Sequence, residues 1–270
     1  MATPRSIPNT LTIAGSDPSG GAGIQADLKT FSALGSYGTS VITALTAQNT
    51  RGVTGVHPVP ADFIAAQLDT LLDDIAIDAV KIGMVASREV AETIREGLAA
   101  RRPPWVVLDP VMVAKSGDTL VDDAGIAAVR DCLVPLADLI TPNLPEAAVL
   151  LDRPVPTDRA GMQALAPALR ELSAGAVLLK GGHLRGEACP DLLITADRLA
   201  WLEAPRIATA NLHGTGCTLS SAITARLALG DALPEAVAAA KAWLSQALAQ
   251  SHRLAVGEGH GPVHHFHAWW

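Results

Sequence analysis

Short runs of Val, Ile and Leu alternate with longer Ala-rich stretches along the whole chain. The short runs predict strands over 11–14, 40–47, 79–82, 105–108, 139–141, 176–180, 191–195 and 199–203. The longer stretches repeat apolar residues at helical spacing and predict helices over 26–34, 61–72, 88–99, 124–132, 145–150, 159–172, 218–229 and 234–255. Buried strands that alternate with helices are typical of a parallel sheet covered by helices on both faces. The chain is therefore predicted to be an α/β protein with a mostly parallel central sheet.

No Ser-rich or Gly-rich linker, composition break or internal repeat divides the 270 residues. A single core can still grow to roughly 250 to 300 residues. We therefore expect one domain over 1–270, with an N-terminal extension over 1–10 and a His-rich tail over 257–270. Two short strands, 191–195 and 199–203, are separated by a three-residue turn and predict a hairpin at the sheet edge.

The charge balance argues against two classes of partner. The chain carries 20 Lys and Arg against 27 Asp and Glu, a formal charge of −7. Nucleic acids and anionic membranes need a basic face on the protein, so we expect it to bind neither. No apolar run approaches the ~20 residues that span a bilayer, and residues 1–9 do not resemble a signal peptide. The protein is expected to be cytoplasmic.

The cysteines and histidines do not predict a structural metal site or a disulfide framework. The three cysteines lie far apart, at Cys132, Cys189 and Cys217. The tail histidines, whose spacing matches no common zinc pattern, are His260, His264, His265 and His267. The last two residues, Trp269 and Trp270, are expected to dock the terminus on the body of the protein.

A glycine-rich segment over 15–27 follows the first predicted strand. Its Gly21-x-Gly23-x-x-Ala26 matches the degenerate dinucleotide pattern, but the next strand ends in 47–50 without the acidic residue that would hold a ribose. A dinucleotide is therefore not expected. Flexible backbone at the carboxyl end of a strand suits a small substrate. The alternative is a glycine-rich connection without any ligand.

A second glycine-rich segment leads into an apolar helix. Its central residues are Gly214, Thr215, Gly216 and Cys217. Successive amides at a helix N-terminus favour an anion, and we predict an anion hole here. No Gly-Lys-Ser/Thr step is present, so the segment is not a P-loop. Cys217 in the first helical turn is expected to have a lowered pKa and to accept a proton from a substrate hydroxyl, with a buried thiol as the alternative.

Polar residues follow three further predicted strands: Asp109, then Asn143 with Glu146, then Lys180. Oxygen ligands suit Mg²⁺, and a lysine suits a polyphosphate. Each residue alone is more often a helix cap, a turn residue or a surface charge. Together at one edge of one sheet they predict a phosphoryl-transfer site.

These motifs resemble the bacterial hydroxymethylpyrimidine/phosphomethylpyrimidine kinases, the thiamine-pathway family of the ribokinase-like superfamily. The resemblance runs from Leu11 to the end of the chain. Its densest segments are 14–29, 43–50, 81–84, 109–112, 141–146, 180–183, 213–218 and 259–266.

The resemblance implies a three-layer α/β/α ribokinase-like fold, a homodimer, and ATP with Mg²⁺ as the phosphoryl donor. It implies that 4-amino-5-hydroxymethyl-2-methylpyrimidine is converted to its monophosphate and then to its diphosphate. By motif, Gln48 would bond the aminopyrimidine edge. The residues implied to line the substrate pocket are Gly15, Ala22, Met84 and Val111.

The same resemblance assigns the phosphate side of the site. Residues 214–217 would form the anion hole, and Lys180 with Asn143 and Glu146 would serve the nucleotide. Asp109 and Glu146 would hold the metal. Many ribokinase-like sugar kinases carry Asp as the base where this chain has Cys217, and a thiolate is a weaker hydrogen-bond acceptor than a carboxylate.

Two other functions stay open. A pyridoxal kinase of the same superfamily would share the fold, the donor and the anion hole, although segments 48–50 and 81–84 favour the aminopyrimidine. A pyrimidine-binding regulator without catalysis is the second alternative. The intact segment 214–217, together with Glu146 and Lys180, argues against it.

Overall fold

The computed structural model describes residues 7–112, 123–172 and 175–270. Within these ranges, nine strands form one sheet in the order β3-β2-β1-β4-β5-β6-β7-β8-β9. The strands are β1 (Asn9–Ser16), β2 (Tyr37–Asn49), β3 (Gly52–Pro58), β4 (Ala79–Ile82), β5 (Trp105–Leu108), β6 (Leu139–Ile140), β7 (Ala176–Lys180), β8 (Asp191–Ile194) and β9 (Leu199–Leu202). The six strands from β2 to β7 in this order are parallel, and β3, β8 and β9 form antiparallel pairs at the two edges.

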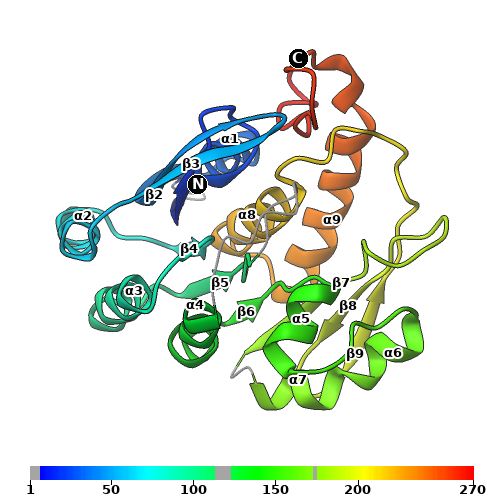
Figure 1. Ribbon diagram of the computed structural model, residues 1–270, viewed down its shortest axis with the longest axis horizontal. Helices are drawn as coiled ribbons and strands as arrows, with labels where there is room; N and C mark the ends of the chain where they lie inside the picture. Colours follow the sequence, from blue (N-terminus) through cyan, green and yellow to red (C-terminus); the bar gives the residue numbers. More distant parts are fainter. Residues whose placement is uncertain (1–6, 113–122, 173–174) are drawn as a thin grey trace, which may run out of the picture.

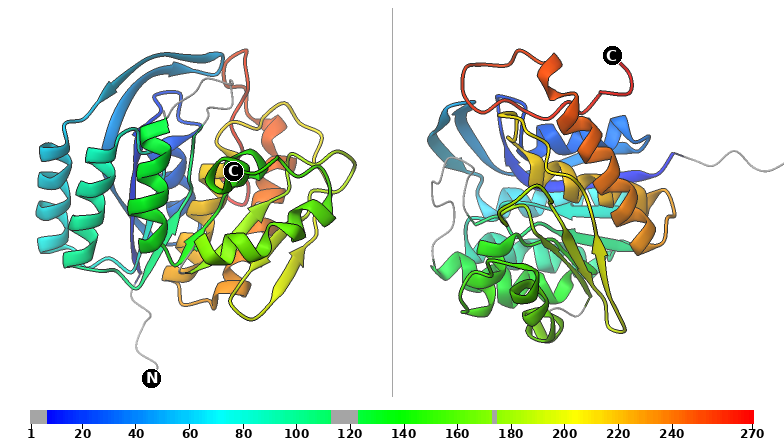
Figure 2. Two further views of the ribbon diagram at one scale, coloured as in Figure 1. Left: turned by 60° about the horizontal axis from the view of Figure 1, so that its bottom comes forward. Right: turned by 90° about the vertical axis from the view of Figure 1, so that its right-hand side faces the viewer.

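Helices cover both faces of the sheet. They are α1 (Gly23–Ala33), α2 (Ala61–Asp74), α3 (Arg88–Ala100), α4 (Asp123–Ala128), α5 (Leu144–Leu151), α6 (Arg159–Ala164), α7 (Ala166–Leu172), α8 (Thr215–Ala228) and α9 (Leu233–Ala249). Figure 1 shows α2 to α7 on one side of the sheet and α1, α8 and α9 on the other. The two further views of Figure 2 show the same two helical layers with the sheet between them. The predicted three-layer arrangement is confirmed.

Two apolar clusters hold these layers together. One packs the sheet against α2, α3, α5, α6 and α7. The other packs the opposite face against α8 and α9. All four residues of β4 are buried, as expected for a strand covered on both faces. The local runs of Val, Ile and Leu therefore mark the central strands correctly.

Some elements differ from the sequence prediction. β3 was not predicted, because Gly52, Gly55 and Pro58 weaken the strand pattern and most of its side chains face solvent. The helix predicted over 159–172 is divided into α6 and α7 at Leu165. β1 begins at Asn9, inside the N-terminal extension expected over 1–10, and residues 1–6 of that extension lie outside the described residues.

Several helix ends also shift. α8 begins at Thr215, three residues before the predicted start, and α9 ends at Ala249, after which a 3-10 turn covers Ser251–Arg253. α4 continues into a π-helical turn at Val129–Leu133. The predicted hairpin of β8 and β9 is confirmed, with β9 at the sheet edge. No helix in the described part of the chain is long and apolar enough to span a membrane.

Candidate active site

The carboxyl ends of the parallel strands lie at one edge of the sheet, where open α/β sheets bind ligands. Asp109 follows β5, Asn143 follows β6 and Lys180 ends β7. Both glycine-rich segments also reach this edge, since the first follows β1 and the second enters α8. The strand order thus collects residues that lie far apart in the sequence.

Asp109 and Lys180 form a buried ion pair beside the start of α8. Lys180 Nζ lies 2.8 Å from Asp109 Oδ1, which also accepts a hydrogen bond from Thr141 Oγ1 at 3.0 Å. A Cβ atom on Gly216 would lie 3.4 Å from both Asp109 Oδ2 and Lys180 Nζ. The structure therefore brings together the predicted phosphate contact, a predicted metal ligand and the predicted anion hole.

Asp109 and Lys180 each stabilise the charged form of the other. Burial raises the pKa of Asp109, but Lys180 and Lys81 outweigh burial and the net pKa is lowered. Burial also disfavours the Lys180 cation, yet Asp109 and Glu146 raise its pKa overall. Both groups are therefore charged at neutral pH.

Asn143 and Glu146 form the capping box of α5. Asn143 Oδ1 accepts a hydrogen bond from the amide of Glu146 at 2.9 Å, and Glu146 Oε2 accepts one from the amide of Asn143 at 2.8 Å. The alternative interpretation of Asn143 as a helix cap thus applies, since its oxygen is already in use. Burial raises the pKa of Glu146 to about 7, opposed by Lys180 and assisted by Asp109.

The second glycine-rich segment turns sharply before α8. Gly214 has φ +73, and a Cβ atom there would lie 1.7 Å from the carbonyl oxygen of Gly21. Glycine is therefore required for two reasons, the left-handed backbone and the close approach of the first loop. This close approach places the start of α8 against the first glycine-rich segment.

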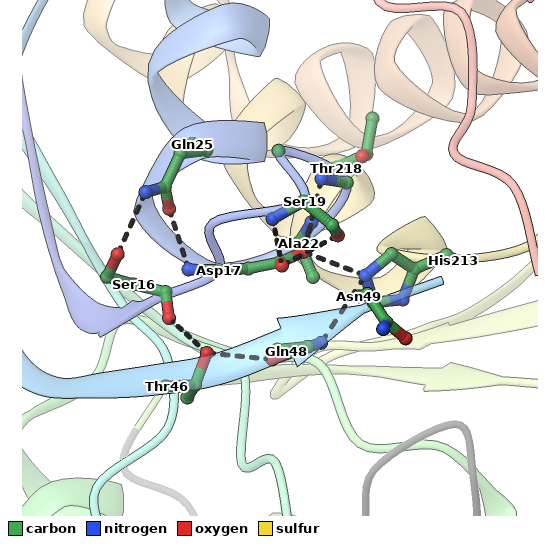
Figure 3. A network of polar contacts seen from close by, with 12 residues as sticks. Ser16, Asp17, Ser19, Ala22, Gln25, Thr46, Gln48, Asn49, His213 and Thr218 are labelled. Carbon is green, nitrogen blue, oxygen red and sulfur yellow. Dashed lines mark hydrogen bonds and ion pairs between the residues drawn. The ribbon is translucent and has the colours of Figure 1, made fainter. Parts of the chain in front are cut away.

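Asp17 organises the first glycine-rich segment (Figure 3). Its Oδ1 accepts hydrogen bonds from the amide and hydroxyl of Ser19, and its Oδ2 accepts from the amides of Gly21 and Ala22. His213 Nε2 lies 2.8 Å from the same Oδ2. Burial raises the pKa of Asp17, but its hydrogen bonds to His213 and Ser19 lower it to about 2. Asp17 and His213 thus join the two glycine-rich segments.

The sequence patterns did not assign a role to Asp17 or His213, although both lie within the densest segments of the family resemblance. An Asp followed by Pro-Ser-Gly is a turn signal whose carboxylate bonds the backbone ahead of it. That signal was present for Asp17. Nothing local indicated that His213 would reach it across 196 residues of sequence.

Gln48 lies near the end of β2 and faces the same network (Figure 3). Its Nε2 is 3.5 Å from His213 Nε2, and its Oε1 accepts a hydrogen bond from Thr46 Oγ1 at 3.1 Å. The half-buried amide thus lies between Thr46 and the nitrogen through which His213 contacts Asp17.

Some of the residues predicted to line the substrate pocket lie next to each other. A Cβ atom on Gly15 would lie 3.0 Å from Met84 Cε, so these two residues adjoin. The Cα atom of Ala22 lies 3.1 Å from where a Cβ on Gly214 would be, which places Ala22 against the anion-hole segment. Val111 follows Asp109 by two residues, and its amide donates to the Asp109 carbonyl oxygen.

Cys217 departs from the prediction. Burial raises its pKa to about 11, although Lys81 and the amide of Gly23 favour the thiolate. The expected lowering is therefore wrong. The free energy lost when a thiolate is removed from water exceeds the stabilisation that the helix N-terminus and the nearby lysine provide.

A buried ion pair behind Cys217 was also missed. The side chains of Asp27 and Lys81 are fully buried and lie 2.8 Å apart. Asp27 also accepts hydrogen bonds from Thr12 Oγ1 and Ser221 Oγ, both at 2.6 Å. Ser221 is one helical turn after Cys217 on α8. A lysine inside the apolar strand β4 was the available signal, because such a residue needs a buried partner.

The His-rich tail docks through residues other than the terminal tryptophans. Val263, His264 and His265 are buried, whereas Trp269 and Trp270 are exposed. The indole N–H of Trp269 reaches the carbonyl oxygen of Ala33 at 3.4 Å. The expectation that the tryptophans dock the tail is therefore correct only for this one contact.

Comparisons with known proteins agree on one family. The sequence profile of the phosphomethylpyrimidine kinases matches residues 17–264. The hydroxymethylpyrimidine/phosphomethylpyrimidine kinase of Escherichia coli K12 is 55% identical over 262 residues, which cover 97% of this chain and 98% of that protein.

Solved structures show the same fold. The phosphomethylpyrimidine kinase of Clostridium difficile 630 is 44% identical with a TM-score of 0.80, and the match covers 89% of this chain and 99% of that one. The pyridoxal kinase of Staphylococcus aureus, solved in complex with AMP-PCP and pyridoxal, is 33% identical with a TM-score of 0.88. That match covers 98% of this chain and 96% of the other.

Proposed function

The chain belongs to the phosphomethylpyrimidine kinase family and is a phosphotransferase of thiamine biosynthesis, and from this premise we propose how its site works. It transfers phosphoryl groups from ATP to 4-amino-5-hydroxymethyl-2-methylpyrimidine, giving the monophosphate and then the diphosphate. The proximity of Gly216 to the Asp109 and Lys180 pair carries this proposal, because it brings the start of α8 next to a cation and a carboxylate.

The nucleotide phosphates lie against Lys180 and the capping box of α5. Lys180 is a buried cation that can compensate phosphate charge. Two buried carboxylates, Asp109 and Glu146, form a hard-oxygen donor set of the kind that Mg²⁺ uses together with water and phosphate. When bound there, Mg²⁺ would compensate charge on the donor's phosphates. No group of three or more His, Cys, Asp or Glu side chains that could hold a metal ion is found in the described ranges.

The pyrimidine lies at the other end of the site. A glutamine amide offers both a donor and an acceptor, which match a ring nitrogen and its neighbouring amino group. The Gln48 side chain lies between Thr46 and His213, at 3.1 Å and 3.5 Å from their polar atoms. In this proposal Gly15, Ala22, Met84 and Val111 would line the pocket for the ring.

The two steps make different demands on Cys217. In the first step an alcohol loses a proton as it attacks, and the Cys217 thiolate accepts it. In this proposal the amides of Gly214, Gly216 and Cys217 stabilise the phosphoryl group in transfer, whereas the amide of Thr215 already donates to the Leu212 carbonyl oxygen. In the second step the attacking phosphate oxygen is already anionic and needs no base.

Pyridoxal is the competing substrate, since a pyridoxal kinase shares this fold over almost the whole chain. A coupled assay for ADP release separates the candidates when it is run with the hydroxymethylpyrimidine, its monophosphate and pyridoxal. We expect turnover of both pyrimidines and much slower turnover of pyridoxal. Turnover of pyridoxal alone would reject the proposal, and binding without ADP release would indicate a regulator.

The homodimer, the cytoplasmic location and the single domain over 1–270 stay predictions. Size-exclusion chromatography with light scattering tests the first of these. A mass of twice 27.9 kDa is expected.

A further inference from the structure

The C-terminal strap, residues 257–265, contacts the turn between β2 and β3. The amide of His260 donates to the Thr50 carbonyl oxygen at 2.8 Å, and the amide of Gly259 donates to Thr50 Oγ1 at 3.1 Å. Arg51 and Glu258 add an exposed ion pair. Figure 1 shows this red segment beside the far end of the hairpin. The hairpin is the element that carries Gln48.

The strap next contacts the segment that precedes α8. The amide of His213 donates to the Gly261 carbonyl oxygen at 3.0 Å, and His213 pairs with Pro262 in a β-bridge. Pro262 also reaches the first glycine-rich segment, because a Cβ atom on Gly21 would lie 3.2 Å from Pro262 Cβ. The strap thus lies against both glycine-rich segments.

The strap ends against the first turn of α8. His265 Nε2 lies 3.1 Å from Thr218 Oγ1, and both side chains are buried. The amide of Thr218 donates to the Gly214 carbonyl oxygen at 2.8 Å, which closes the first turn of the helix. Cys217 lies in that same turn. A contact on Thr218 therefore bears directly on the position of the thiol and its neighbouring amides.

We propose that the C-terminal strap is a positioning element of the site, in which His265 holds the first turn of α8 while Gly259 and His260 hold the hairpin that carries Gln48. The hairpin needs such support, since β3 is an edge strand with mostly exposed side chains. The strap therefore holds the pyrimidine end and the phosphate end of the site at a fixed position relative to each other. The effect of the strap on catalysis rests on the proposed function, whereas its effect on the reactivity of the Cys217 thiol does not.

The first experiment measures the alkylation rates of individual cysteines by iodoacetamide and peptide mass spectrometry. In His265→Leu, we expect Cys217 to react about fivefold to tenfold faster than in the unmodified protein, the factor that one buried hydrogen bond is worth. His265→Gln keeps a polar atom near Thr218 and should restore most of the protection. Buried Cys132 is the internal control, since global destabilisation would expose it too.

A matched control uses a second histidine of the tail. His267 contacts Trp243 and Gln246 on α9 rather than α8, so His267→Gln should leave the alkylation of Cys217 unchanged. Unchanged alkylation of Cys217 in His265→Leu would overturn the proposal. An equal rise at Cys217 and Cys132 would also overturn it, because the strap would then contribute stability alone.

The second experiment tests the hairpin contact by kinetics. Thr50→Val keeps the side-chain shape but removes the acceptor for Gly259, and we expect the KM for the hydroxymethylpyrimidine to rise about twofold to fivefold with an unchanged KM for ATP. Thr50→Ser should restore the original KM. Equal changes in both KM values, or no change, would remove the hairpin from the proposal. If the unmodified protein does not phosphorylate the pyrimidine, the proposed function fails, and the alkylation rates still decide the role of the strap.

Discussion

At the scale of single residues, the surroundings of a group decide its chemistry more than its position in an element. Cys217 lies in the first turn of a helix, where a thiolate is favoured, yet burial raises its pKa to about 11. Asp17 is also buried, but hydrogen bonds hold its pKa at about 2. The difference is the number of donors, because Asp17 accepts several hydrogen bonds that compensate for its lost hydration.

The pKa of Cys217 predicts the pH dependence of the first phosphorylation. Below about pH 11 the thiolate fraction rises tenfold per pH unit, so the rate with the alcohol should rise from pH 7 to pH 9. The monophosphate, whose second pKa is about 6, is already ionised and its rate should stay flat. Cys217→Ala should lose about 10²-fold to 10⁴-fold with the alcohol and little with the monophosphate. Equal losses on both substrates would refute the role as a base.

A substitution at Gln48 should weaken the binding of the pyrimidine and leave the binding of ATP unchanged. Gln48→Ala leaves the aminopyrimidine edge without a partner, which costs about 1 to 3 kcal/mol of binding free energy. Calorimetric titration should show weaker binding of the pyrimidine and unchanged binding of ATP. Gln246→Ala, at an exposed position on α9, is the control and should change neither affinity. Unchanged pyrimidine affinity in Gln48→Ala would remove this residue from the site.

At the scale of elements, the residues that start α5 are also ones proposed to act in the site. The capping box of α5 places Glu146 beside Lys180 and Asp109, and the buried side chain has a pKa of about 7. An exposed glutamate would cap the helix as well without this rise in pKa. The cap therefore fixes the position of a carboxylate whose burial costs stability once it is ionised.

Glu146→Gln should lower activity while it raises stability. The folded pKa of about 7 lies above the ordinary value of 4.5, so the folded state of the unmodified protein holds a proton that the unfolded state has lost. Its stability should therefore fall between pH 4.5 and pH 7, and the variant should avoid this loss, by about 1 to 3 kcal/mol. Urea unfolding at about pH 5 and about pH 7.5, two values that span most of this pH range, measures the difference in stability between the two proteins.

The activity of Glu146→Gln should recover in part at high Mg²⁺, because the lost carboxylate charge helps to recruit the ion. Glu203→Gln, at an exposed position, should show neither effect. Loss of pyrimidine affinity with a normal Mg²⁺ dependence would contradict the assignment of Glu146.

At the scale of the whole molecule, the buried pair of Asp27 and Lys81 connects elements from three parts of the chain. Asp27 belongs to α1 and Lys81 to β4, and Ser221 of α8 donates to Asp27. Burial disfavours the Lys81 cation, but Asp27 raises its pKa. The pair thus joins α1, α8 and the central strands of the sheet close to the predicted anion hole.

Breaking this pair should be costly, and replacing both partners should not. Lys81→Met leaves the buried Asp27 without its cation, a loss of about 3 to 5 kcal/mol in the free energy of unfolding. The double variant Asp27→Leu with Lys81→Met should recover most of that loss. Denaturant unfolding at neutral pH measures both.

The control for this prediction is Arg101→Met, which breaks an exposed ion pair with Asp73 and should cost about 0 to 1 kcal/mol. A double variant that is less stable than Lys81→Met would contradict the prediction.

The sequence alone determined the order of the helices and strands apart from β3 and the division of α6 from α7, and it also determined the parallel sheet and the motifs at its edge. Hydrophobic periodicity is set by residues within one or two turns of each other, so it can be read locally. β3 could not be predicted in this way, because an edge strand with two glycines and a proline is defined by its pairing with β2.

Only the tertiary structure decided which groups meet and how they ionise. Asp17 meets His213 across 196 residues, Asp27 meets Lys81 across 54, and Thr218 meets His265 across 47. The pKa of Cys217 likewise depends on burial and on charges that other segments bring to it. An ionisation energy is set by the dielectric and the charges nearby in space, and neither exists until the chain has folded.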